Sequence, residues 1–340
     1  MAFKLVAIGF YTPGTGLTRV MNSILRRLAD RHEIHYLGIG YSGEAIRDRG
    51  LTIYPTNPKG GDVFAAFQAA SLIEAIQPQV VFILHDIWMF EYYLRILGPY
   101  RDRLKIAAYI PLDGKITNEK AAAALRDADR VIVYTEFARV EFVNAFARLG
   151  QGFPQVDVIP HGVDRERFFP IPEQRDPGSF VVLNASRPDR RKRLDLTIAG
   201  FAQFATGKPD NVKLCLHHAF FGKREQEQIR GWIREFGVED RVSVNPQGGG
   251  VRDDRELNLL YNACHVGINT SMGEGWGLVS FEHGATGAAQ IVPDHTACAE
   301  LWRGRWRICI AIRSGGAGWG KRLAGRHRIR IILQCRCTSV

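Results

Sequence analysis

Residues 266–285 read VGINTSMGEGWGLVSFEHGA, and this stretch decides the fold prediction. Its apolar start, Val266-Gly267-Ile268-Asn269, is typical of a buried strand in a parallel sheet. Its end, residues 278–285, predicts a helix. The glycine-rich loop between them therefore lies at a strand-to-helix turn. Ligands of open α/β sheets bind outside the carboxyl ends of such strands.

The loop and the helix each carry a carboxylate, Glu274 and Glu282. A helix N-terminus attracts anions because its first N–H groups are unpaired and its dipole end is positive, and a glycine-rich loop lets a phosphate approach the backbone. Carboxylates beside such a site suit hydroxyl groups instead. Either Glu alone is more often a solvated surface residue. The three glycines, Trp276 and the strand end together favour a site for a sugar nucleotide.

Glu274, seven further residues and Glu282 form an E-x7-E pattern. Together with residues 269–278 and Gln290-Ile291-Val292-Pro293, this pattern resembles the signature of retaining glycosyltransferases with the GT-B fold, especially glycosyltransferase family 4. The resemblance implies an α/β fold of two Rossmann-like, doubly wound domains that face each other across a cleft.

Length and composition agree with two such domains. The 340 residues are enough for two separate cores, and 46% apolar with 24% charged residues is ordinary for globular proteins. No apolar run reaches the roughly 18 to 20 residues of a membrane span. Residues 1–10 are typical of a first strand rather than of a signal peptide. We therefore expect a cytoplasmic protein.

The net charge of +10 lies in the C-terminal tail. Residues 303–340 hold ten Arg or Lys residues and no Asp or Glu, so residues 1–302 are formally neutral. A surface that binds polyanions in general is therefore not indicated for the body of the protein.

A glycine-containing turn follows the first predicted strand, residues 4–10, and precedes a helix predicted at 17–29. Its glycines, Gly14 and Gly16, could cradle a phosphate, although a tight turn without a ligand is as good an interpretation of this motif alone. Arg19 occupies the third glycine position of a G-x-G-x-x-G fingerprint, which weakens a nicotinamide-binding interpretation. In the glycosyltransferases that the chain resembles, this turn approaches the donor diphosphate and the acceptor.

The rest of the first half alternates strands with helices, which favours a doubly wound parallel sheet. His85 follows a strand predicted at 80–84, and Asp113 follows a strand predicted at 105–110. Both lie at the carboxyl edge where a ligand would bind, although polar residues at strand ends are often only caps. The other elements predicted here are strands 33–37 and 130–134 and helices 61–76, 121–128 and 136–149.

The junction between the halves also resembles the family. The sequence IPHGVD at 159–164 resembles the family's hinge into the second domain, and a linker rich in Pro, Asp and Gly follows at 172–178. We place the N-terminal domain, on the acceptor side, at 1–165 and the nucleotide-sugar-binding domain at 166–302.

A basic loop, ASRPDRRKR at 185–193, follows the first strand of the second half, 180–184, and precedes a helix predicted at 194–204. Five basic residues in seven could be a solvated loop, but at a helix start they favour contacts with a diphosphate. Arg187 and Lys192 fit the R-x4-K pair that in the resembled family neutralises the leaving diphosphate. Further strands are predicted at 212–217, 241–244 and 266–269, and helices at 224–236 and 254–263.

Residues 303–340 depart from the family pattern. They are rich in Arg, Gly and Trp, contain three cysteines, and lack a recognisable form of the strand and helices that the family implies next. Their composition resembles a frameshifted or otherwise altered sequence. A basic tail that binds nucleic acid is the rival interpretation.

Together with these features, the resemblance implies a retaining glycosyltransferase of the hexosyltransferase type, which moves a sugar from a nucleoside-diphosphate sugar to an acceptor hydroxyl without a metal or other cofactor. The resemblance implies that Glu282 binds the ribose diol and that Arg187 and Lys192 stabilise the diphosphate. The implied catalytic residues are Glu274, Arg187, Lys192, His85 and Asp113. The implied donor-binding residues are Gly14, Gly16, Arg187, Lys192, Gly275, Trp276, Gly277, Leu278 and Glu282.

Several questions stay open at this level. The acceptor could be a saccharide, a lipid-linked molecule or another small molecule, no nucleic-acid partner is expected, and peripheral contact with a membrane is undecided. A non-catalytic nucleotide-sugar-binding protein with a defective C-terminus is the main alternative. An epimerase or dehydrogenase would need a complete glycine fingerprint and a Tyr-x-x-x-Lys pair, and the sequence shows neither.

Overall fold

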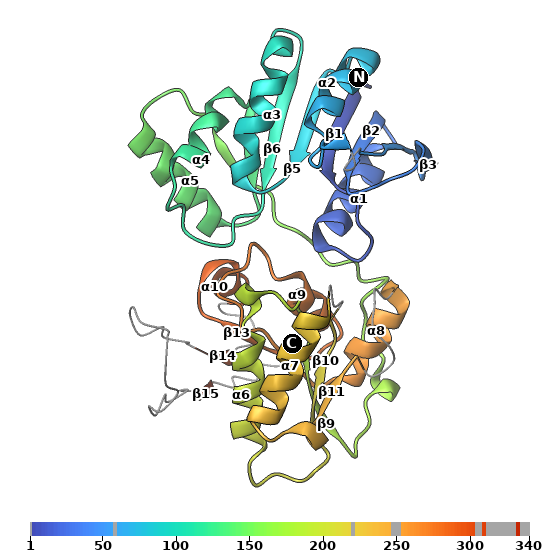
Figure 1. Ribbon diagram of the computed structural model, residues 1–340, viewed down its shortest axis with the longest axis vertical. Coiled ribbons are helices and arrows are strands. Elements are labelled where there is room, and N and C mark those ends of the chain that lie inside the picture. Colours follow the sequence, from blue (N-terminus) through green and yellow to red (C-terminus); the bar gives the residue numbers. More distant parts are fainter. Residues whose placement is uncertain are drawn as a thin grey trace, which may run out of the picture. The chain divides into compact units, whose positions relative to one another are not determined.

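The computed structural model describes residues 2–56, 60–218, 222–245 and 253–302, and the backbone of 308–310 and 331–333. The chain forms two compact units, Met1–His161 and Gly162–Val340 (Figure 1). The division therefore falls after His161, within the IPHGVD sequence, whereas the sequence placed it after Arg165. Each unit is an α/β body built on one sheet.

The first unit contains an eight-stranded sheet in the order β3-β4-β2-β1-β5-β6-β7-β8. Every neighbouring pair is parallel except β3 with β4, which is an antiparallel hairpin. The strands are β1 (Lys4–Phe10), β2 (Glu33–Ile39), β3 (Ile46–Asp48), β4 (Leu51–Tyr54), β5 (Val80–Leu84), β6 (Lys105–Ile110), β7 (Arg130–Val133) and β8 (Val156–Val158). Since β2 and β5 lie on opposite sides of β1, the strand order reverses direction between β1 and β5.

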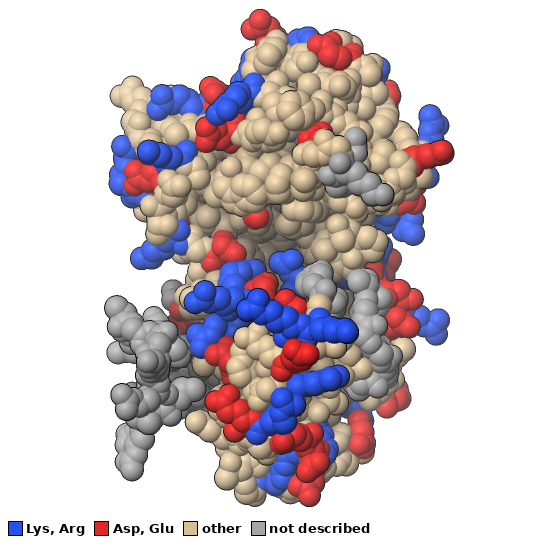
Figure 2. Space-filling view, viewed as in Figure 1, with Lys and Arg blue, Asp and Glu red and all other residues tan. Residues whose placement is uncertain are grey.

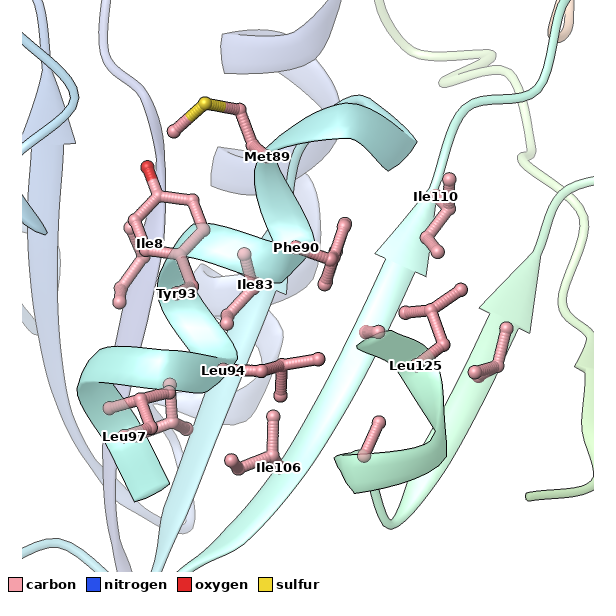
Figure 3. Packing of buried hydrophobic residues seen from close by; sticks show 14 of the residues in the cluster. Ile8, Ile83, Met89, Phe90, Tyr93, Leu94, Leu97, Ile106, Ile110 and Leu125 are labelled. Carbon is pink, nitrogen blue, oxygen red and sulfur yellow. The ribbon is translucent and has the colours of Figure 1, made fainter. Parts of the chain in front are cut away.

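Helices of the first unit pack apolar residues against this sheet. They are α1 (Gly16–Leu28), α2 (Ala66–Ile76), α3 (Phe90–Leu97), α4 (Lys120–Ala123) and α5 (Glu136–Leu149). Figure 3 shows Phe90, Leu94 and Leu97 of α3 beside Ile83 and Ile106 of the strands, and all five are buried. This packing fixes the end of β5, and with it the position of the residues that follow.

The second unit repeats the doubly wound arrangement, with strands in the order β11-β10-β9-β12-β13-β14-β15. Its strands are β9 (Phe180–Asn184), β10 (Val212–Leu216), β11 (Val242–Val244), β12 (Val266–Ile268), β13 (Ala289–Pro293), β14 (Ile308–Ile310) and β15 (Ile331–Leu333). The pairs are parallel apart from β14 with β15. Here the order reverses between β9 and β12.

Both faces of this second sheet are covered. Its helices are α6 (Leu194–Ala205), α7 (Lys223–Glu235), α8 (Asp254–Ala263), α9 (Leu278–Ala285) and α10 (Thr296–Trp302). Successive β9 residues point to opposite faces: Val182 packs with residues of α6 and α7, and Leu183 packs with residues of α8 and α9. A strand buried on both faces requires a continuous apolar run, which residues 180–183 supply.

Some predicted elements differ from the observed ones. The helix expected at 61–76 begins only at Ala66, because Asp62 accepts hydrogen bonds from Phe67 N and Gln68 N and Ala65 adopts a left-handed φ of 59°. The helix expected at 121–128 is the short α4 followed by a 3₁₀ turn, Ala124–Asp127.

The tail predicted as atypical, residues 303–340, lies mostly outside the described residues. Two of its segments are described, and both are short strands that the sequence pattern did not make recognisable. The first, β14, pairs in parallel with β13, and β15 pairs with β14. Each is only three residues long and is flanked by Arg-rich sequence, which explains why the sequence pattern did not indicate it.

Candidate functional site

The basic loop and the acidic loop meet at the place where the second sheet reverses its strand order. The first loop, 185–193, follows β9, and the second, 269–277, follows β12, which is paired with β9. A reversal of strand order opens a crevice at the carboxyl ends of the two central strands, which is the usual ligand position in open α/β sheets. In Figure 2, Lys and Arg side chains gather on the upper part of the second unit.

Hydrogen bonds to backbone and side-chain groups fix the basic loop. Asp189 caps the 3₁₀ turn Arg190–Lys192 by accepting from Lys192 N at 3.2 Å. Thr270, at the end of β12, donates to the carbonyl oxygen of Lys192 at 3.0 Å and bonds Thr197 of α6 at 2.8 Å. Lys192 is thereby held between the two central strands and the start of α6, and its residue exposure is only 9%.

Lys192 and Glu274 form a buried ion pair. Lys192 Nζ donates to Glu274 Oε1 at 2.6 Å, and the side chains are 11% and 9% exposed. Asn269 Nδ2 donates to the same carboxylate oxygen at 3.0 Å. The backbone of Glu274 is also fixed, since its N–H donates to Thr296 Oγ1 at 3.1 Å. The Glu274 carboxylate is therefore already held in position at the switch point, the place where the strand order reverses between β9 and β12.

The pKa of Glu274 is set by two opposing effects. Burial raises it, but the charge and hydrogen bond of Lys192, the charge of Arg191 and the hydrogen bond from Asn269 together outweigh burial. The net result is a pKa below the ordinary value, so Glu274 is ionised at neutral pH. An ionised carboxylate is an acceptor only and is suited to hydroxyl donors.

Arg191 joins the two loops. Its guanidinium donates to the carbonyl oxygen of Gly273, and its Nη1 lies 3.7 Å from Glu274 Oε2. Its own carbonyl oxygen accepts from Met272 N at 2.8 Å. The R-x4-K spacing had singled out Arg187 and Lys192, so the position of Arg191 is a feature that sequence reasoning did not distinguish within the basic run.

Arg187 differs from Lys192 and Arg191 in its exposure to solvent. Its side chain is 58% exposed, and Asp189 Oδ2 is 4.0 Å from its Nη2. The structure therefore places Lys192 on Glu274 and leaves the Arg187 guanidinium at the surface of the same loop. A solvated, weakly held guanidinium can reorient toward a ligand at little cost.

The helix within the E-x7-E segment positions the second carboxylate. Gly277 precedes α9 with a φ of 87°, a conformation that favours glycine. Glu282 is buried in α9, and Tyr261 of α8 donates to its Oε2 at 3.4 Å. Trp276 is buried edge-to-face against Phe281, 5.3 Å between ring centroids. Gly275 and Leu278 lie within this segment and are partly exposed.

The remaining predicted residues belong to the first unit. His85 follows β5, and the turn with Gly14 and Gly16 follows β1, so both lie at the switch point of the first sheet. The ring of His85 packs against Phe10 at 5.0 Å between centroids. Gly14 and Gly16 are exposed, and Gly14 has a φ of 77°. Asp113 is exposed after β6.

His85 is a neutral imidazole at physiological pH. Burial lowers its pKa to about 4, against a smaller opposing effect of its hydrogen bond with Asp86 N. That backbone N–H donates to Nδ1 at 2.8 Å, so Nε2 carries the proton. Within the described residues, the buried Nε2 has no hydrogen-bond partner. A buried donor of this kind suits a ligand oxygen.

The described residues lack two kinds of feature. They contain no group of three or more His, Cys, Asp or Glu side chains placed to hold a metal ion. Among the helices they form, none has the length and apolar character that crossing a membrane requires.

No protein-family model matches the chain. The mannosylfructose-phosphate synthase of Agrobacterium fabrum is 30% identical over 155 residues, which cover 41% of this chain and 33% of that protein. The match thus spans about a third of the length of this curated relative.

Solved structures resemble the chain over most of its length. Sucrose-phosphate synthase from Thermosynechococcus elongatus has a TM-score of 0.70 at 17% identity, covering 87% of this chain and 82% of that one. Anabaena HepE in complex with UDP-glucose has a TM-score of 0.66 at 17% identity, covering 88% and 82%. The UDP-forming trehalose-phosphate synthase from Burkholderia xenovorans has a TM-score of 0.68 at 14% identity, covering 88% and 86%. The predicted α/β fold of the GT-B type is confirmed; at these identities, likeness extends to fold alone.

Proposed function

We propose that the chain is a retaining glycosyltransferase that moves a sugar from a nucleoside-diphosphate sugar to an acceptor hydroxyl without a metal ion. The observation that carries this proposal is the buried contact of Lys192 with Glu274 at the switch point between β9 and β12, 2.6 Å between Nζ and Oε1. It joins a cation suited to phosphate with a carboxylate suited to hydroxyls at one ligand-binding edge. The solved HepE structure with bound UDP-glucose supports a donor of this class.

Each donor group has a complementary side chain in the second unit. Lys192 and Arg187 neutralise the diphosphate, and Glu274 accepts hydrogen bonds from hydroxyls of the donor sugar, with the N–H groups of Gly275 and Trp276 beside it. Glu282 accepts from the ribose diol. Gly277 and Leu278, at the start of α9, bring backbone close to the ligand.

The reaction breaks the bond between the anomeric carbon and the diphosphate oxygen, and the electron pair leaves with the diphosphate. Lys192 and Arg187 stabilise the charge that grows there; preorganised charge of this kind is usually the largest catalytic contribution. The acceptor oxygen bonds to the anomeric carbon on the face that the diphosphate leaves, and its proton passes to the leaving phosphate. Configuration at the anomeric carbon is thereby retained.

The first unit supplies the acceptor side of this proposal. His85 Nε2–H, Asp113 and the turn with Gly14 and Gly16 lie at the carboxyl edge of its sheet. The curated relative and two of the solved structures are named as synthases of phosphorylated disaccharides, which supports a free or phosphorylated sugar as the acceptor.

A donor screen tests the proposed function. The purified chain is incubated with UDP-, GDP- and ADP-glucose in EDTA, with and without hexoses and hexose 6-phosphates. The Tm, the release of nucleoside diphosphate and the formation of disaccharide are measured. We expect one donor to support transfer, with the α-configuration of the donor kept in the product. Stabilisation by a donor without transfer favours a protein that only binds nucleotide sugars. No response to any donor contradicts the assignment of the site.

A further inference from the structure

Arg191 contacts the acidic loop through both its side chain and its backbone. The guanidinium donates to the Gly273 carbonyl oxygen and lies 3.7 Å from Glu274 Oε2, and the Arg191 carbonyl oxygen accepts from Met272 N at 2.8 Å. Residues on either side of this arginine differ from it: Arg190 is exposed, and Lys192 is buried on Glu274. Arg191 is therefore built into the contact between the two loops.

The two oxygens of Glu274 have different cationic neighbours. Oε1 accepts from Lys192 Nζ at 2.6 Å and from Asn269 Nδ2 at 3.0 Å, and Oε2 faces Arg191. A further titratable group that interacts with this carboxylate is His295, just before α10. Burial lowers the pKa of His295, so this imidazole is neutral at physiological pH and supplies no compensating charge.

Donor binding creates a conflict for Lys192. Under the proposed function its ammonium engages the donor diphosphate, and Glu274 then loses its nearest cation. The Glu274 residue is only 7% exposed, and a buried carboxylate without a compensating charge takes up a proton instead of staying ionised. A protonated Glu274 would no longer be a pure acceptor for sugar hydroxyls.

We propose that Arg191 is a positioning residue that keeps Glu274 ionised and in place while Lys192 serves the donor diphosphate. This inference rests on the proposed function. Arg191 suits the role because its guanidinium is held by the Gly273 carbonyl oxygen, away from the carboxylate oxygen that Lys192 occupies, so the movement of Lys192 leaves it in position. A guanidinium also stays charged at every physiological pH.

The test is the pH dependence of kcat at saturating donor in Arg191→Gln, Arg191→Lys and Arg190→Gln. We expect the acidic limb of kcat in Arg191→Gln to lie about one pH unit higher than in the wild type, so that the ratio of variant to wild-type kcat falls by up to about tenfold as the pH is lowered through both limbs. Arg191→Lys restores much of the wild-type limb. Arg190→Gln removes one positive charge from the same turn and leaves the limb unchanged.

The same inference can be tested through nucleotide binding, without measuring turnover. Whichever of UDP, GDP and ADP raises the Tm of the wild type is used as a probe of the diphosphate site. In Arg191→Gln, this nucleotide should raise Tm less than in the wild type at pH 8, because its binding draws Lys192 from Glu274 and leaves that carboxylate charged and buried without a cation. At pH 5.5, proton uptake by Glu274 relieves this cost, so the rise in Tm should approach that of the wild type. Without nucleotide, Lys192 still pairs with Glu274, so the Tm of the variant should depend on pH only slightly more than that of the wild type.

The contrary outcomes are distinct. An equal fall of kcat at all pH values in Arg191→Gln, or the same limb shift in Arg190→Gln, overturns the role of Arg191 and leaves the proposed function standing. A wild type whose Tm no nucleotide raises and which releases no diphosphate contradicts the proposed function, and the inference falls with it.

Discussion

Lys192 and Glu274 are 82 residues apart in the sequence, and their charged atoms lie 2.6 Å apart in the structure. They meet because β9 and β12 are neighbours in the second sheet although β10 and β11 lie between them in the sequence. The pair is buried at the edge of that sheet where the strand order reverses. Its burial makes it testable through stability as well as through binding.

Replacing Lys192 by Met should destabilise the protein by about 3 to 5 kcal/mol, because it leaves the buried Glu274 carboxylate without its closest cation. The midpoint of urea unfolding at pH 7 measures this change. The double variant Lys192→Met/Glu274→Met removes both charges and should recover much of the loss. Equal destabilisation of Lys192→Met and the double variant would show that the unpaired Glu274 carboxylate is not the cause of the loss.

The pKa of Glu274 predicts how stability depends on pH. Since its folded-state pKa is lowered from the ordinary value of 4.5, the unfolded chain takes up the proton first as the pH falls. The stabilisation is therefore complete above about pH 4.5 and is lost as the pH falls through the folded-state pKa. Its size is about 1.4 kcal/mol for each pH unit that separates the folded-state pKa from the unfolded-state pKa. Urea unfolding between about pH 3 and pH 7, compared with Glu274→Gln, measures it. A constant difference between the two proteins across this range is the opposite result.

Arg187→Ala should lower turnover strongly and leave the stability of the fold nearly unchanged. The guanidinium is more than half exposed, so its removal should change the free energy of unfolding in urea by less than about 0.5 kcal/mol. The same change should reduce kcat roughly a hundredfold, because a stabilising charge on the leaving diphosphate is lost. Unchanged turnover would remove Arg187 from the catalytic set.

Gly277→Ala should cost about 1 to 2 kcal/mol of stability, because an alanine must adopt the left-handed φ of 87°. A Cβ there would lie 3.6 Å from Cys298 Sγ and 3.9 Å from Glu274 Cγ, so the cost comes from the backbone and not from a clash. Gly231→Ala is the matched control: it lies within α7 in open space and should stabilise the protein slightly. Similar Tm changes of the same sign in both variants would contradict this account.

The sequence predicted the architecture well where strands are buried on both faces. The apolar runs at 80–84, 105–110 and 180–184 coincide with β5, β6 and β9 at both ends. The hairpin of β3 and β4 escaped prediction, because Ile46–Asp48 is short, largely exposed and polar, and forms only by pairing with a neighbouring strand. The α3 helix was not predicted either, because it contains several aromatic residues and these are enriched in strands.

The two loops of the candidate site could be predicted from the sequence, but the contacts between their side chains could not. The glycine-rich and basic loops carry strong local patterns, and alternation of strands and helices brings them to one edge. Which of the consecutive basic residues points inward depends on the 3₁₀ turn at 190–192 and on the left-handed Arg193, with a φ of 49°. Neither the turn nor the Thr270 hydrogen bonds that hold it have a recognisable sequence pattern. The sequence therefore could not show which of Arg191 and Arg187 contacts the acidic loop.

The most direct test of the central claim is calorimetric titration of UDP and UDP-glucose, without metal, into the wild type, Lys192→Met and Glu274→Gln. The account predicts that Lys192→Met weakens both ligands by roughly tenfold or more, because both carry the diphosphate. Glu274→Gln should weaken UDP-glucose by about tenfold and should not weaken UDP, because only the sugar contacts this carboxylate and its charge no longer competes with the diphosphate for Lys192. Equal loss of both ligands in Glu274→Gln, or wild-type affinities that neither substitution alters, would contradict a nucleotide-sugar site built on Lys192 and Glu274.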